Sequence, residues 1–312
     1  MTAHLRTACA ARLLPLLLLA LPAAVQAAPA PPPDYTYSDN GDGTITITGY
    51  TGAGGDVTIP DTIVGWLVTG IGSAAFSGNT SLTSVTIGTN VTSIGDYAFN
   101  SCTNLTGVTI LDSVTNIGQY AFAFCSSLVS VTLPNNIESI AWYMFDGCSN
   151  LPSITIPGSV ASVGLGAFQD CPNLKGVYFK GDIPGFFGDL YYDPGCRCLR
   201  YSYEVFLGAT TNVTLYFLPG TSGWGSTASG RPTVLWNPQP QTSDTSFGVR
   251  TNQFGFNIAG TSNLVIVVEA CADLANPDWS PVQTNILTGG SSYFSDPQWT
   301  NSPGRFYRLR SP

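Results

Sequence analysis

Side chains able to carry out catalysis are scarce in this sequence. The one histidine, His4, lies within residues 1–27, which we expect to be removed from the mature chain for reasons given below. Without histidine, Ser-His-Asp and Cys-His nucleophile pairs are excluded, as are histidine-containing zinc and iron sites. We therefore predict no catalytic residue, no bound metal and no cofactor.

The carboxylates are dispersed along the chain. Asp61, Asp112 and Asp146 fall in different segments, and no paired acids are evident. A glycosidase, which needs two carboxyl groups flanking one bond, stays an alternative because folding can gather distant acids. Residues Ser38–Gly43 resemble part of a calcium loop, but Gly49 stands near the place where a bidentate acid is required. A hairpin turn is the preferred interpretation of this run.

Four cysteines recur once in every 23 residues. They are Cys102, Cys125, Cys148 and Cys171. Residues one repeat apart point the same way from adjacent layers, so we expect reduced thiols that fill a core. A metal site or a set of disulfides is the alternative. Cys196, Cys198 and Cys271 lie outside this series, and any disulfide among them stays open.

The same interval governs the apolar residues. One column holds Ile71, Ile94, Ile117, Ile140 and Val163, and another holds Phe76, Phe99, Phe122, Phe145 and Phe168. Each repeat alone buries only part of its apolar surface, and stacking completes a continuous core. Ser84–Ile87 alternates polar and apolar side chains and is predicted as a short strand. Its copies predict a β-rich solenoid of 23-residue coils with a parallel sheet along one face.

The columns together resemble the BspA-like class of leucine-rich repeats. The pattern is Leu-x-x-Val-x-Ile-Pro-x-x-Val-x-x-Ile-Gly-x-x-Ala-Phe-x-x-Cys. Leu128–Asn150 carries it almost complete, with Ala141 in place of the glycine and Met144 in place of the alanine. The resemblance covers roughly residues 57–217. Members are bacterial and protozoan surface or secreted proteins, some of them adhesins, so it implies attachment to host proteins, matrix or neighbouring cells and no reaction.

The segments outside the repeats predict an exported chain with a second module. Residues 1–27 combine two arginines, an apolar run and a small-residue site, which is typical of a signal peptide cleaved after Ala27. We therefore expect a secreted or cell-surface protein without a transmembrane segment in the mature chain. The C-terminal region also resembles a β-module found on many secreted bacterial proteins. The predicted parts are a Pro/Ala-rich spacer (28–34), a solenoid with caps at both ends (35–236), an irregular insertion within it (187–211), a linker (237–246) and a small antiparallel β-sandwich-like module (247–312).

The balance of acidic and basic residues limits the classes of partner that the chain is expected to bind. After loss of residues 1–27, nine basic residues face 19 acidic ones. That excess argues against nucleic acid, whose binding rests on basic residues that neutralise phosphate. We expect a protein or glycan partner at a cell surface or in a matrix.

Two groups of residues are predicted to bind. The insertion gathers aromatic and arginine side chains, which are favoured at interface hot spots. They are Tyr191, Tyr192, Arg197, Arg200, Tyr201 and Tyr203. The outward column of the predicted sheet is Thr86, Thr109, Thr132 and Thr155, with Tyr178 continuing it. A purely structural interpretation stays open for both, because aromatic residues also cover the end of a core and threonine suits an exposed strand.

The sequence thus favours a non-catalytic secreted or cell-surface binding protein. Its leucine-rich-repeat scaffold would mediate protein, matrix or cell-surface adhesion. A glycan-binding accessory module and a structural protein of envelope assembly are the two alternatives.

Overall fold

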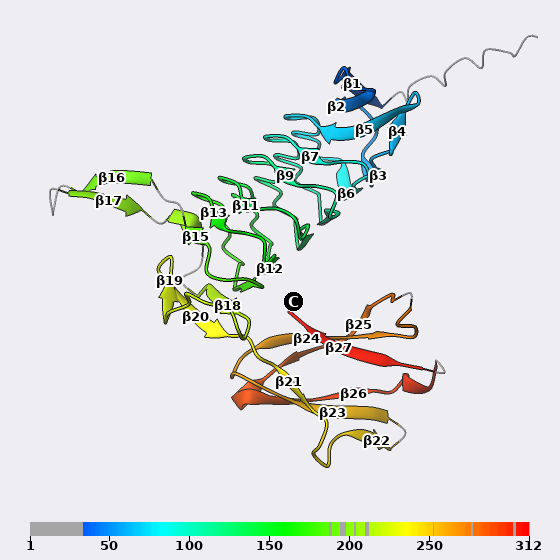
Figure 1. Cartoon of the computed structure of the whole chain (residues 1–312), viewed down its shortest axis with the longest axis vertical. Coiled ribbons are helices and arrows are strands. Elements are labelled where there is room, and N and C mark those ends of the chain that lie inside the picture. Colours follow the sequence, from blue (N-terminus) through cyan, green and yellow to red (C-terminus); the bar gives the residue numbers. More distant parts are fainter. Residues whose placement is uncertain are drawn as a thin grey trace, which may run out of the picture.

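The chain folds into a stack of coils with a group of antiparallel strands beside its C-terminal end (Figure 1). The structure is a computed structural model, and it describes residues 34–311 apart from 187–188, 194–197, 203, 210–211, 252, 276 and 302–303. The expected signal peptide and nearly all of the spacer lie outside the described residues. The predicted β-rich leucine-rich-repeat solenoid with antiparallel C-terminal sheets is confirmed.

An antiparallel hairpin covers the first coil. The strands of this region are β1 (Tyr35–Asp39), β2 (Thr44–Tyr50), β4 (Thr62–Ile63) and β5 (Trp66–Ile71). The turn between β1 and β2 is held by two carboxylates: Gly41 N donates to Asp39 Oδ1 at 2.7 Å, and Thr44 N donates to Asp42 Oδ1 at 3.1 Å. The predicted hairpin turn is therefore present. β2 pairs in parallel with β5, which joins the hairpin to the solenoid.

Each coil contributes strands to two ladders of parallel pairs. The first contains β3 (Gly55–Thr58), β6 (Leu82–Thr86), β8 (Gly107–Thr109), β10 (Ser130–Thr132), β12 (Ser153–Ile156), β14 (Gly176–Phe179), β18 (Thr214–Phe217) and β20 (Arg231–Leu235), with β19 (Thr227–Ala228) antiparallel at its end. The second continues from β5 through β7 (Ser93–Ile94), β9 (Asn116–Ile117), β11 (Ser139–Ile140), β13 (Ser162–Val163) and β15 (Gly185–Phe186). The repeat pattern predicts the first ladder. It does not predict the second, whose strands are too short to show an alternation.

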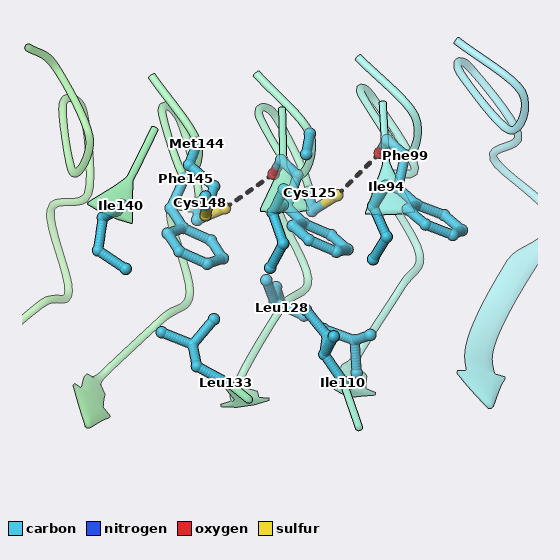
Figure 2. Close-up of a cluster of buried hydrophobic side chains, with 14 of the residues drawn as sticks. Ile94, Phe99, Ile110, Cys125, Leu128, Leu133, Ile140, Met144, Phe145 and Cys148 are labelled. Atoms are coloured by element: carbon cyan, nitrogen blue, oxygen red, sulfur yellow. Dashed lines mark hydrogen bonds between the residues drawn. The ribbon is translucent and has the colours of Figure 1, made fainter. Parts of the chain in front are cut away.

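The core repeats from coil to coil as the columns predict. Phenylalanine rings stack along the solenoid at centroid distances of 4.9 to 5.8 Å. The cysteine column lies beside them, and each thiol donates a hydrogen bond to a phenylalanine carbonyl of the preceding coil. Cys125 Sγ, for example, lies 3.2 Å from Phe99 O, and Cys148 Sγ lies 3.2 Å from Phe122 O (Figure 2). The four column cysteines are buried and unbridged, so the predicted ladder of reduced thiols is confirmed.

The first ladder is interrupted at one coil because a proline replaces a donor. Elsewhere the residue before the strand donates its N–H to the preceding coil: Val129 N donates to Thr106 O, and Lys175 N donates to Pro152 O, both at 2.9 Å. Pro152 has no N–H to give to Val129. Among the described strands, β10 and β12 are accordingly not paired.

The second ladder is interrupted at the same coil by a side chain. Ala141 stands where the preceding coil has Gly118, at which a Cβ would lie only 2.5 Å from Asp96 N. The Cβ of Ala141 therefore prevents the close approach that glycine allows, and β9 and β11 are not paired in the described structure. The turns stay joined across this boundary, since Phe122 N donates to Met144 O at 3.0 Å. We call this boundary the seam.

The predicted insertion contains more regular secondary structure than expected. Within residues 187–211, β16 (Asp189–Asp193) and β17 (Cys198–Ser202) form an antiparallel pair, and a short 3-10 helix, η1 (Glu204–Phe206), follows. Describing this insertion as irregular is therefore wrong. Phe206 stacks on Phe168 at 5.6 Å and is buried, so it extends the column of stacked phenylalanine rings.

The C-terminal strands form two antiparallel sheets around their own core. One contains β21 (Gln239–Gln241), β22 (Gly248–Arg250), β23 (Gln253–Ala259) and β26 (Ser291–Asp296), and the other contains β24 (Val265–Cys271), β25 (Ser280–Ile286) and β27 (Phe306–Arg310). Two 3-10 helices are η2 (Thr288–Gly290) and η3 (Trp299–Asn301). Because β21 pairs with β23, the segment 237–246 is partly strand and not only a linker. Within the described residues, no helix has the length and apolar character needed to cross a bilayer.

Candidate binding surfaces

The outward threonine column forms an exposed face over three coils. Thr86, Thr109 and Thr132 are exposed and lie in register on β6, β8 and β10. The next two members are covered. Thr155 Oγ1 lies 2.7 Å from Ser311 Oγ, and Tyr178 is only 6% exposed. We call the column the hydroxyl face, and its C-terminal end meets the antiparallel sheets.

Tyr178 departs from the expectation of a continuous exposed column. It aligns with Thr155 in the β12–β14 pair, so its place in the column is as predicted. Its ring, however, stacks on Tyr216 at 4.6 Å and meets Trp236 edge-on at 6.3 Å. Tyr216 and Trp236 also pack against the core of the C-terminal sheets. These contacts between residues far apart in the sequence bury Tyr178, and a local repeat does not predict them.

A second surface lies on the turns that connect the two ladders. Tyr97, Tyr120 and Tyr143 occupy the same position in successive coils, and their rings stack at 4.8 and 4.7 Å with interplanar angles of 5° and 9°. Trp142 and Phe124 lie on the same turns. Tyr97, Phe124 and Trp142 are between 45% and 49% exposed, which is unusual for large aromatic side chains. We call these five residues the aromatic edge.

The backbone holds four residues of the aromatic edge in the left-handed region. The φ angles are 59° at Tyr97, 56° at Tyr120, 54° at Tyr143 and 58° at Phe124. This conformation costs a non-glycine residue about 1–2 kcal/mol. It is imposed by the coil-to-coil bonds of the turns, such as Tyr120 N to Trp142 O at 3.1 Å. Stacking of about 0.5–1.5 kcal/mol per ring pair offsets part of this cost.

Only some of the predicted binding residues of the insertion lie on the antiparallel pair of strands β16 and β17. Tyr191 and Tyr192 lie on β16, and Arg200 and Tyr201 lie on β17. The register places Tyr191 opposite Arg200. Figure 1 shows this pair of strands projecting away from the stack. Arg197 and Tyr203 lie outside the described residues, as does Cys196.

Two of the carboxylates bond neighbouring coils, and a third bonds strands of the C-terminal sheets. Asp61 Oδ1 accepts from Thr89 N at 2.7 Å, and Asp112 Oδ1 accepts from Asn135 N at 2.7 Å. These bonds from the next coil hold the pKa of Asp112 below its usual range, together with a weaker contribution from Lys180. Asp296 likewise accepts from Tyr307 Oη at 3.0 Å inside the C-terminal sheets. Such acids fasten the backbone and are not arranged around a common substrate.

Asp146 is the exception among the acids. Its side chain is buried, and Oδ1 has no hydrogen-bond partner among the described residues. Burial, reinforced by the negative charge of Asp170, raises the pKa of Asp146 to about 6. The described His, Cys, Asp and Glu side chains form no group of three or more that could hold a metal ion.

The repeats match a known family. A model of the BspA type leucine rich repeat region matches residues 57–190 in six copies. A leucine rich repeat protein of T. pallidum is 30% identical over 61% of this chain and 86% of its own, with a TM-score of 0.47. The chain belongs to the BspA-type leucine-rich-repeat family.

Two further solved leucine-rich-repeat structures are similarly distant. A leucine rich cell surface protein from Faecalibacterium prausnitzii is 31% identical, covering 47% of this chain and 44% of that one, with a TM-score of 0.39. A leucine-rich repeat protein from Bacteroides capillosus is 30% identical, covering 47% of this chain and 95% of that one, with a TM-score of 0.31. No curated protein matches the chain. BspA-type repeats are generally non-catalytic binding scaffolds.

The aromatic edge is the feature of this BspA-type chain that the sequence interpretation missed. Its signal is present, because Tyr97, Tyr120 and Tyr143 recur at the repeat interval two residues before the phenylalanine column. The sequence alone does not show that these rings stack and are exposed, because that depends on the position of the turns at the outer edge of the solenoid.

Proposed function

We propose that this protein is a secreted or cell-surface adhesion protein that binds a partner protein or matrix component without transforming it. The observation that carries the proposal is the aromatic edge, where Tyr97, Phe124 and Trp142 are exposed on the turns that carry the stacked rings of Tyr97, Tyr120 and Tyr143. Tyrosine and tryptophan are enriched at the energetic centres of protein interfaces. A stack that holds these rings in place lowers the entropy lost on binding.

Two further surfaces belong to the same proposal. The hydroxyl face offers a regular row of donors and acceptors from Thr86 to Thr132. The β16–β17 pair offers Tyr191, Tyr192, Arg200 and Tyr201, with Arg197 and Tyr203 beside it in sequence. The expected signal peptide would export the chain to the place where such partners occur.

Neighbouring coils supply substitutions that leave the fold intact. Glycine occupies the Phe124 position in the next coil, at Gly147, and glutamine occupies the Trp142 position in the preceding coil, at Gln119. A Phe124→Gly, Trp142→Gln variant therefore removes two exposed rings and installs residues that the repeat already tolerates. Asn116→Ser is the matched control, because Asn116 is exposed on β9 outside the three surfaces and the neighbouring coils carry Ser93 and Ser139 at its position.

The test measures binding of purified residues 28–312 to immobilised extracellular-matrix proteins and to whole cells. We expect the aromatic variant to bind at least tenfold more weakly, since loss of one hot-spot side chain costs about 2 kcal/mol or more. The control should bind as the parent does. Equal binding by the aromatic variant would move the site to the hydroxyl face or to the β16–β17 pair, which a variant with Tyr191, Tyr192, Tyr201 and Tyr203 changed to Ala then separates. A hydrolase activity abolished by Asp146→Asn would overturn the non-catalytic proposal.

A further inference from the structure

A cavity lies where the hydroxyl face meets the C-terminal sheets. Its volume is about 700 Å³, within the range of ligand sites in proteins. One wall is the sheet face of β10, β12 and β14, and the other is formed by β24 and β27. We call it the groove. The seam runs beneath it, since the unpaired strands β10 and β12 both contribute to the same wall.

Basic side chains are concentrated in the groove. Lys180, Arg308 and Arg310 line it, which is a third of the nine basic residues in 28–312, whereas Glu269 is the one acid in the lining. Lys180 is exposed, and the side chains of Arg308 and Arg310 are 48% and 40% exposed. Asp112 is near enough to Lys180 for the lysine to lower its pKa, but it does not line the groove. In a strongly acidic chain, this is a local excess of positive charge.

Glu269 fixes the two arginines in place and does not exhaust their donors. It is buried, and Arg308 Nη2 lies 2.7 Å from its Oε2. Burial opposes ionisation of Glu269, but hydrogen bonds from Arg310 and Arg308 outweigh it, so its pKa is lowered and the carboxylate stays charged. Each guanidinium carries five N–H donors, more than one carboxylate can accept. The remaining donors suit a second anion.

The other lining groups are hydroxyls and aromatic rings. Thr132, Thr155 and Ser311 carry hydroxyls along the groove, and Tyr216 and Trp236 contribute rings. Rings that meet apolar C–H faces and hydroxyls that meet hydroxyls are the two contacts that a sugar residue makes.

We propose that the groove binds a short segment of an acidic polysaccharide, with uronate or sulfate groups on Lys180, Arg308 and Arg310. Its walls are mainly sheet faces, so an occupant is recognised by side chains rather than by addition of a strand to an edge. That favours a glycan over an extended acidic peptide. The paired strands β12 and β14 of this wall lie ~4.8 Å apart, close to the length of one sugar residue in an extended chain. This site is separate from the aromatic edge and does not depend on it.

The test is calorimetric titration of the full mature chain with three probes of equal length. They are a hexagalacturonate, a neutral hexasaccharide and a hexaglutamate peptide. We expect the uronate to bind, the neutral sugar to bind at least tenfold more weakly, and the peptide to bind no better than the neutral sugar. Lys180→Gln should weaken uronate binding about tenfold, as expected for loss of one charge-assisted contact. Lys175→Gln, an exposed lysine outside the groove, is the matched control and should change binding less than twofold.

Four outcomes overturn the proposal: no binding of any probe, equal binding of the uronate and the neutral sugar, stronger binding of the peptide, or equal loss in the Lys180→Gln and Lys175→Gln variants. Trp236→Phe provides a check within the groove, because it reduces the ring surface available to a sugar face, and it should weaken uronate binding severalfold. A chain that fails these tests but still adheres through the aromatic edge leaves the proposed adhesion function standing, so the two failures are distinguishable.

Discussion

Replacing Asp146 by asparagine should stabilise the protein above pH 6 and have little effect below pH 4. The carboxyl group is buried, its Oδ1 has no hydrogen-bond partner among the described residues, and its pKa is raised to about 6 by burial and by Asp170. The folded state therefore holds the proton more tightly than the unfolded state does. The associated stability is complete below the ordinary pKa of 3.8, falls as the pH rises to about 6, and is absent above that. Asparagine keeps the shape without the charge.

The size of the effect follows from the same values. The difference between about 6 and 3.8 corresponds to about 3 kcal/mol. Local relaxation and entry of water reduce it, so we expect a gain of about 1–3 kcal/mol at pH 8. The assay is urea unfolding of the parent and the Asp146→Asn variant at intervals from pH 3.5 to 8. Asp170→Asn is the partner variant, and it should give a smaller gain by removing the nearby charge. A stability difference that is independent of pH would refute the reasoning, as would a destabilised variant at pH 8.

The repeat supports three further predictions. Phe122→Ala should lower the free energy of unfolding by about 3–5 kcal/mol in urea, because it empties a fully buried place in the ring stack, whereas a loss below 1 kcal/mol would show that the stack closes over the gap. Burial raises the pKa of Cys148 well above its usual value, so iodoacetamide at pH 8 should modify it only after unfolding, and Cys148→Ala should cost about 1–3 kcal/mol because it removes the buried sulfur and its hydrogen bond to Phe122 O. The amide of Ala141 should exchange hydrogen faster than that of Gly118, which donates to Ile94 O at 2.8 Å, and equal protection measured by NMR would show that the seam is closed in solution.

The extent to which sequence predicts this molecule depends on whether a contact repeats. The phenylalanine and cysteine columns predict the stacked core because identical side chains must meet in adjacent coils. The exposed members of the hydroxyl face follow in the same way from strand alternation. Tyr178 is a position at which the repeat predicts the wrong exposure. Its column position predicts exposure, but Tyr216, Trp236 and the C-terminal sheets bury it, and those contacts join parts of the chain that share no period.

The β16–β17 pair illustrates a different limit. A strand in an antiparallel pair is recognised by alternation, yet Leu190, Tyr191 and Tyr192 are all large and apolar or aromatic, so period two disappears. The pairing is set by the partner strand, which the sequence of a single strand does not encode. The same reason explains why β21 escaped notice within a proline-rich stretch, since its pairing with β23 is supplied by residues beyond it.

Departures from the repeat carry as much structural information as the repeat itself. Ala141 and Pro152 each replace one residue, and each breaks a ladder by a separate mechanism: one adds a Cβ where two coils must touch, and the other removes a donor. The turns remain bonded through Phe122 and Met144, so the coils stay joined along the aromatic edge while the ladders part. The unpaired strands β10 and β12 both line the groove, so the interrupted first ladder belongs to the wall that faces Arg308 and Arg310 of β27.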